Sequence, residues 1–120
     1  MRVLTMLFTA LLLSACAAPS LYEWGGYESM LYQGYKDPAK MEELKVQLQA
    51  HIAELEESGM KVAPGLYAEL GTLYLQGGAA EQAIAMYKRE RDTWPESNQL
   101  MTAMIQNIER RQQAKAGAGK

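Results

Sequence analysis

The stretch of residues 64–95 constrains the fold more than any other part of the chain, because it holds two helical patterns separated by a turn. In its first half, aromatic and leucine residues recur at i, i+3 and i+7 and therefore share one helical face. These residues are Tyr67, Leu70 and Tyr74. The second half carries a facing stripe made of Ala83, Ile84 and Tyr87. Gly77 and Gly78 permit a tight reversal between the halves, so we expect antiparallel helices at about 64–76 and 79–93.

Small residues in this stretch mark the place where the two helices approach each other, because Gly71 and Ala83 allow close backbone contact. The whole spacing resembles a tetratricopeptide repeat. The residues that carry the resemblance are Tyr67, Leu70, Gly71, Tyr74, Ala83, Tyr87 and Pro95. It implies a helical hairpin that binds other proteins. Two positions depart from the pattern, with Ala80 in place of a large residue and Glu90 in place of a small one.

Two apolar stripes predict further helices on either side of this hairpin. Asp37 and Pro38 form a helix start, which leads into Met41, Leu44, Leu48, Ile52 and Leu55 and ends at Gly59. Ser97 is a second candidate cap, followed by Leu100, Met101, Met104, Ile105 and Ile108. A short helix is also expected at 27–36. The sequence therefore predicts an all-α domain at 21–113, with one clear repeat and flanking helices, and a disordered Gly-rich tail at 114–120.

The N-terminus has the pattern of an exported protein. Arg2 precedes an apolar run at 3–13, which is too short to span a bilayer as a helix but suits a signal peptide at 1–15. The following Leu13-Ser14-Ala15-Cys16 resembles the bacterial lipobox. This resemblance implies that Cys16 carries diacylglycerol and palmitate-type acyl chains, with residues 16–20 as a short tether. The alternative is an ordinary cleaved signal with an incidental cysteine.

The residue after the cysteine is Ala17. An aspartate at this position would resemble an inner-membrane retention signal, and this chain does not have it. By this analogy, we expect an outer-membrane protein that is lipid-anchored and faces the periplasm.

Aromatic residues are concentrated in residues 21–35, which contain Tyr22, Trp24, Tyr27, Tyr32 and Tyr35. One interpretation is that these rings cap the end of the helical stack. The other is a partner-binding patch formed by Tyr22, Trp24, Tyr27 and Tyr32, since Tyr and Trp are enriched in interface hot spots. A second candidate contact surface is the concave face of the first repeat helix, at Ala68, Thr72 and Leu75. It lacks the Lys and Asn with which some repeats clamp a carboxylate.

Composition argues against several function classes. Lys and Arg number 12 against 14 Asp and Glu, for a net charge of −2, whereas nucleic-acid binding needs a basic excess. His51 is the single histidine and no free cysteine remains after lipidation, so we expect no metal, no cofactor and no enzymatic activity. The mixed-sign residues 88–92 are expected to form a solvated face.

The chain as a whole resembles a family of short bacterial outer-membrane lipoproteins with a tetratricopeptide-repeat-like domain. The resemblance rests on the lipobox, on Tyr22-x-Trp24-Gly25-x-Tyr27-Glu28, and on residues 64–71 and 95–97. Members are often encoded beside a lipoprotein that resembles the curli secretion channel, which implies an envelope complex as the partner. We therefore expect a scaffold or adaptor for envelope proteins. Alternatives are a pilotin-like assembly factor for an outer-membrane channel and a small-ligand or glycan-binding module.

Overall fold

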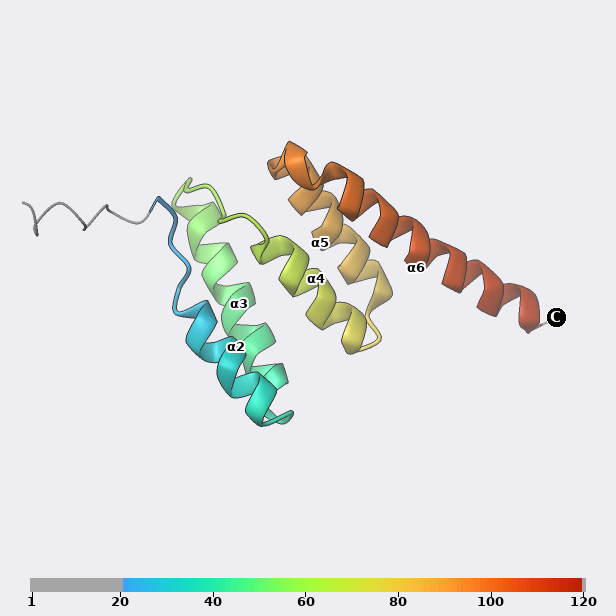
Figure 1. The fold of residues 1–120 in the computed structure, drawn as a ribbon, viewed down its shortest axis with the longest axis horizontal. Helices are drawn as coiled ribbons and strands as arrows, with labels where there is room; N and C mark the ends of the chain where they lie inside the picture. The colour runs from blue at the N-terminus through green and yellow to red at the C-terminus, as the bar shows by residue number, and fades with distance from the viewer. Residues whose placement is uncertain (1–20, 120) are drawn as a thin grey trace, which may run out of the picture.

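The computed structural model describes residues 21–119, and this part of the chain is helical without strands (Figure 1). Its elements, in order, are α2 (Tyr27–Lys36), α3 (Lys40–Glu57), α4 (Leu66–Gln76), α5 (Ala80–Thr93), the 3-10 helix η2 (Pro95–Ser97) and α6 (Asn98–Ala118). The predicted all-α class is therefore confirmed. The predicted signal peptide, Cys16 and the tether up to residue 20 lie outside the described residues.

Helices α4 and α5 form an antiparallel hairpin at the centre of the domain (Figure 1). Its turn closes where the amide of Ala79 donates to the carbonyl of Tyr74 at 2.9 Å, with Gly78 at a φ of 79°. A side chain at Gly78 would be strained in this left-handed conformation, so the reversal requires glycine at this position. The hairpin begins slightly later than predicted, because Pro64 and Gly65 form a turn before α4.

Gly71 is the point of closest approach between the hairpin helices. A Cβ atom placed there would lie 2.8 Å from Cε1 of Tyr87 and 3.2 Å from the carbonyl oxygen of Ala83. The Tyr87 hydroxyl lies 3.0 Å from Thr72 Oγ1, so this buried ring spans the hairpin and keeps a polar partner. The close contact predicted at Gly71 and Ala83 is confirmed.

The buried side chains form two clusters that meet at α4. The first joins α3 to α4 and includes Leu44, Leu48, Ile52, Leu55, Leu66, Tyr67 and Leu70. The second joins α5 to α6 and includes Ala83, Ile84, Tyr87, Met101, Ile105 and Ile108. Both predicted flanking stripes are therefore largely confirmed. Leu100 is an exception at 62% exposed, because it lies 100° around α6 from Met101 and misses the buried face.

Glu90 departs most from the sequence-based prediction, since the expected solvated face at 88–92 contains a side chain that is only 1% exposed. Its Oε1 accepts hydrogen bonds from the Gly65 amide at 2.8 Å and from Ser97 Oγ at 3.4 Å. The carboxyl group thus links the start of α4 to the end of α5 and to η2. Ser97 does not cap α6 as predicted, because its hydroxyl is turned toward Glu90.

The ends of α3 follow the predicted chemistry with a small shift. Asp37 Oδ1 accepts from the Ala39 amide at 3.1 Å, so it caps a turn that precedes the helix, which begins at Lys40. At the other end, the Met60 amide donates to the Leu55 carbonyl at 2.9 Å, and Gly59 has a φ of 69°. This is the glycine-terminated helix end that the sequence predicted.

Helix α6 continues to Ala118 and passes the α4–α5 turn (Figure 1), although residues 114–120 were expected to be disordered. Residues 109–116 are Glu, Arg, Gln, Ala and Lys, which favour helix and contain no stop signal, so the helix extends past its buried stripe. Gln112 Nε2 donates to Glu81 Oε1 at 2.8 Å and attaches this extension to the start of α5. Within residues 21–119, no helix is long and apolar enough to cross a membrane.

Candidate functional site

The predicted aromatic patch is divided by the fold into inward-facing and exposed rings. Tyr22 is half-buried and meets the Trp94 ring edge-on, with centroids 5.5 Å apart. Tyr27 is also half-buried, and burial raises the pKa of its hydroxyl, with a further contribution from the hydrogen-bonding Glu69 carboxylate. These two side chains fit the capping interpretation better than the patch interpretation.

Trp24 and Tyr32 are the exposed members of the predicted patch. Lys36 Nζ lies 4.4 Å from the centroid of the Tyr32 ring, on the same helix. Trp24 belongs to the segment before α2. This segment is fixed to α3 by a hydrogen bond of 2.9 Å, which His51 Nε2 donates to the Glu23 carbonyl. His51, half-buried on α3, therefore has a structural contact.

Trp94 was missed as a structural residue because its aromatic neighbours are far away in the sequence. Its Nε1 donates to the Val62 carbonyl at 3.2 Å, and Lys61 Nζ lies 3.7 Å from the ring centroid. Together with Tyr22, these contacts hold the N-terminal segment, the α3–α4 linker and the end of α5 in one cluster. We name Tyr22, Lys61, Val62 and Trp94 the Trp94 cluster.

The predicted concave surface is only partly available. Ala68 and Leu75 are half-buried against the α5–α6 cluster. Thr72 Oγ1 donates to the Ala68 carbonyl at 3.0 Å and lies 3.0 Å from the Tyr87 hydroxyl, so its polar atom is already occupied. Of these three residues, Leu75 lines two cavities on the surface of the described residues.

Leu75 faces a groove between the end of α4 and the second half of α6, which we name the α4–α6 groove. Two cavities of about 240 and 160 Å³ make up this groove, and they share Leu75, Ile108 and Arg111. The remaining lining residues are Gly78, Ala80, Met104, Asn107, Gln112 and Lys115. The groove thus has an apolar floor supplied by three side chains and a polar rim.

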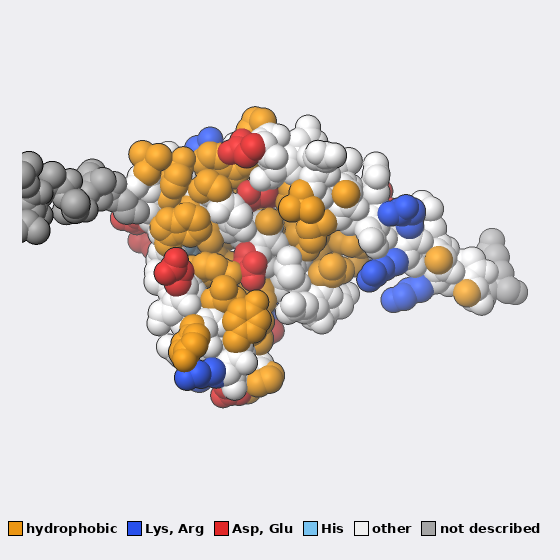
Figure 2. Space-filling view, in the orientation of Figure 1, with side chains coloured by type: hydrophobic (Ala, Val, Ile, Leu, Met, Phe, Trp, Pro, Cys, Tyr) orange, Lys and Arg blue, Asp and Glu red, His pale blue; other side chains and the backbone are white. Residues whose placement is uncertain are grey.

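The rim of the α4–α6 groove is basic. Arg111 and Lys115 line it, Arg110 is their neighbour, and Glu109 is the single acidic residue of α6. The whole chain has a net charge of −2, so this cluster of basic side chains has the opposite sign to the protein as a whole. Figure 2 shows basic side chains gathered near the end of α6, beside hydrophobic ones. An apolar floor with a cationic rim is suited to an apolar segment that also carries carboxylates.

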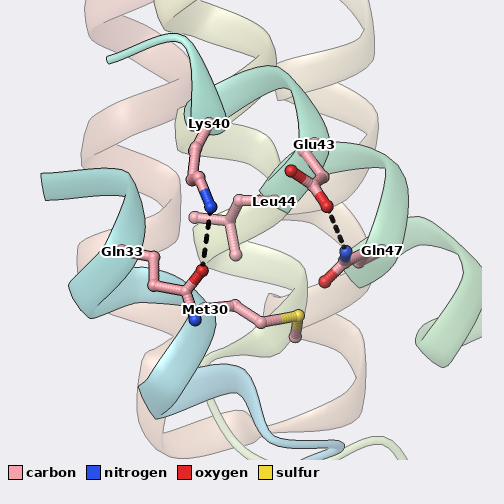
Figure 3. Close-up of a pocket in the computed structure, with 6 residues that line it drawn as sticks. All are labelled: Met30, Gln33, Lys40, Glu43, Leu44 and Gln47. Carbon is pink, nitrogen blue, oxygen red and sulfur yellow. Dashed lines mark hydrogen bonds between the residues drawn. The ribbon is translucent and has the colours of Figure 1, made fainter. Parts of the chain in front are cut away.

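Another, much smaller cavity lies between α2 and α3 (Figure 3). Its volume is about 30 Å³, which is near that of a single water molecule. The polar groups around it already pair with each other, since Lys40 Nζ donates to Gln33 Oε1 at 3.3 Å and Gln47 Nε2 to Glu43 Oε1 at 3.0 Å. This cavity therefore offers no ligand site.

Within the described part of the chain, no group of three or more His, Cys, Asp or Glu side chains could hold a metal ion. Sequence reasoning assigned Met104 and Ile108 to a closing helix and placed Lys115 in a disordered tail, so it missed the groove. The available signals were the Met-rich face of α6 and the adjacent Arg110 and Arg111.

The fold and groove define an all-α helical-hairpin domain with a cavity at one end of its helical stack. The chain belongs to the family described as a domain of unknown function, DUF4810, which matches residues 21–104. The match covers α2 to α5 and ends within α6 at Met104. Searches of curated proteins and of solved structures find no match to the chain.

Proposed function

We propose that this protein is a lipid-anchored, periplasm-facing adaptor that holds a partner protein of the cell envelope. The observation that carries the proposal is the α4–α6 groove, in which apolar Leu75, Met104 and Ile108 lie beside basic Arg111 and Lys115. The tetratricopeptide-repeat-like spacing at 67–95 supports it, because repeats of this kind bind proteins.

The chemistry of the groove favours a helical partner segment. Helices α4 and α6 satisfy their own backbone hydrogen bonds along the groove, so an extended peptide would find few backbone partners there. An amphipathic helix satisfies its own backbone and brings only side chains. We therefore expect an apolar stripe against Leu75 and Ile108, with acidic residues beside Arg111 and Lys115.

The anchor in this proposal is Cys16, on the strength of the lipobox resemblance. Each buried acyl methylene contributes about 0.8 kcal/mol, and more than one chain gives stable anchoring. Ala17 supports the outer membrane as the location. The family resemblance supports a curli-secretion-channel-like lipoprotein as the first partner to test.

A pilotin-like assembly factor is the second candidate function, because it would need the same anchor and the same groove. Co-purification distinguishes the two. An adaptor remains in the finished envelope complex, whereas a pilotin leaves once the channel has assembled. The glycan-binding alternative is less well supported, since the half-buried Tyr22 and Tyr27 present less ring surface than the sequence suggested. We also propose that the protein is not an enzyme.

Mild detergent extraction of native envelopes tests the adaptor proposal. We expect the wild-type protein to be recovered with a partner, and Arg111→Glu combined with Lys115→Glu to lose it. Arg110→Glu is a control for charge reversal at a neighbouring position, because Arg110 is exposed and lies outside the lining of the groove. Recovery of the protein alone, with no crosslinked neighbour in intact cells, would refute both the adaptor and the pilotin.

A further inference from the structure

We propose that the end of the domain that carries the exposed Leu21 and Met60, together with Trp24 from the same N-terminal segment as Leu21, rests on the interface of the bilayer to which the protein is anchored. The inference depends on the proposed lipid anchor and adds the orientation of the domain. Leu21 is 82% exposed, Trp24 is 41% exposed and Met60 is 45% exposed. Figure 2 shows hydrophobic side chains gathered beside the point where the described chain begins.

These side chains come from two segments that the fold brings together. Leu21 and Met60 line one hollow of about 300 Å³, together with Tyr22, Glu23, Leu55 and Lys61. Trp24 follows directly on the same N-terminal segment. The Trp94 cluster fixes both segments, because Tyr22 and Lys61 each contact the Trp94 ring. The apolar surface is therefore held in place before any lipid arrives.

The length of chain before Leu21 determines what this surface can reach. Cys16 is five residues before Leu21, and each extended residue spans at most ~3.6 Å, so Leu21 lies within about 18 Å of the lipidated residue. A bilayer surface is thus the apolar phase nearest to this end of the domain. Trp suits the headgroup region of a membrane, and Lys61 can keep its ammonium group in water.

Charge identifies the kind of lipid surface. Glu23 and Lys61 both line the hollow and carry opposite charges, so the hollow itself has no cationic excess to attract anionic lipids. The surface therefore fits a largely zwitterionic interface, such as phosphatidylethanolamine.

This orientation would present the α4–α6 groove to the periplasm. Trp94 follows the last residue of α5, whereas Ala80 at the start of α5 lines the groove. The 14 residues of α5 span about 21 Å at ~1.5 Å per residue. The Trp94 cluster and the groove-lining Ala80 thus lie at opposite ends of α5, whose course can be followed in Figure 1.

Tryptophan fluorescence tests the inference with a probe that the chain already contains. The full lipidated protein is reconstituted into vesicles of phosphatidylethanolamine and phosphatidylglycerol, with or without brominated acyl chains. Trp24 is exposed and Trp94 is buried within the domain, so we expect brominated lipid to quench Trp24 emission and the vesicles to protect it from aqueous iodide. Trp24→Phe should abolish the quenched component, and Leu21→Ser with Met60→Ser should weaken it.

The outcomes separate the inference from the proposed function. Vesicle-bound protein whose Trp24 remains open to iodide and unquenched by lipid would overturn the orientation and leave the anchor intact. Protein that fails to float with the vesicles would overturn the anchor as well. Quenching that persists unchanged in Trp24→Phe would also count against the inference, because it would come from Trp94.

Discussion

Glu90 and Gly65, separated by 25 residues in the chain, are joined by a hydrogen bond of 2.8 Å from the Gly65 amide to the Glu90 carboxyl group. The contact connects the start of α4 to the last turn of α5, and Ser97 Oγ donates to the same oxygen. A buried carboxyl group thus fixes the end of the hairpin opposite its glycine turn. Glu90 departs from the repeat pattern, yet α6 packs against α5. The Glu90 side chain is turned toward Gly65 and Ser97 and therefore allows this packing.

Replacing Glu90 with alanine should destabilise the domain by about 1–3 kcal/mol, because the Gly65 amide and the Ser97 hydroxyl lose their shared acceptor. Glu90→Gln keeps an acceptor oxygen and should cost less. Urea unfolding monitored by circular dichroism measures both variants. Equal stability of Glu90→Ala and the wild type would show that these hydrogen bonds do not stabilise the hairpin.

Gly71→Ala should destabilise the domain by about 1–3 kcal/mol, since the new methyl group would lie 2.8 Å from the Tyr87 ring and 3.2 Å from the Ala83 carbonyl. Gly77→Ala is a matched control in the same hairpin. Its Cβ would meet only ordinary contacts at 3.5 Å or more, at a φ of −77°. Thermal unfolding should therefore show a lower Tm for Gly71→Ala and an unchanged Tm for Gly77→Ala. An equal decrease in the Tm of Gly77→Ala would contradict the packing argument.

Alkaline pH should destabilise the fold through its buried tyrosines. Burial and the hydrogen bond to Glu56 raise the pKa of Tyr67 from 10.0 to about 12, and burial also raises the pKa of Tyr27 and of Tyr87. The folded state therefore holds these protons more tightly than the unfolded state. This contribution is fully present below pH 10.0 and is lost as the pH rises toward about 12.

A pH series of thermal unfolding curves checks this dependence, with Tyr67→Phe as the comparison. This variant lacks one of the raised groups, so its Tm should decline less steeply above pH 10.0. If the Tm of the variant and of the wild type declined equally above pH 10.0, Tyr67 would not contribute to the loss of stability at alkaline pH.

Partner binding should weaken as the salt concentration rises, and it should depend on the side of α6 that carries Arg111 and Lys115. Reversing Arg111 together with Lys115 should lower partner recovery about tenfold, which corresponds to about 1.4 kcal/mol. Recovery by the wild type should also fall as ionic strength rises, since exposed charges are screened. A similar loss in Arg110→Glu would indicate a general charge effect and would argue against the α4–α6 groove.

The hairpin could be predicted from the sequence because its determinants are local. The spacing of Tyr67, Leu70 and Tyr74 defines a face, and the small size of Gly71 marks the contact with the second helix. Burial of Glu90 could not be predicted in this way. It depends on the Gly65 amide, which only the tertiary fold brings within hydrogen-bonding distance.

The candidate site was less predictable than the fold, because it lies between elements. Leu75 was identified as a contact residue from its place on the first repeat helix. Its partners Ile108, Arg111 and Lys115 became visible only once the crossing of α6 over the end of α4 was known. The same holds for Trp94, whose contacts with Tyr22 and Lys61 join residues far apart in the chain.

The most direct test of the adaptor proposal is photocrosslinking in living cells from a probe at Met104, compared with the same probe at Gln106. The two positions are 200° apart around α6. Met104 lines the groove, whereas Gln106 is exposed and lines a separate, open hollow with Thr102 and Ala103. We predict that the probe at Met104 captures one envelope protein through an acidic, apolar segment, and that reversing Arg111 and Lys115 reduces this product about tenfold. Equal capture from Gln106, or no protein captured from Met104, would contradict the proposal.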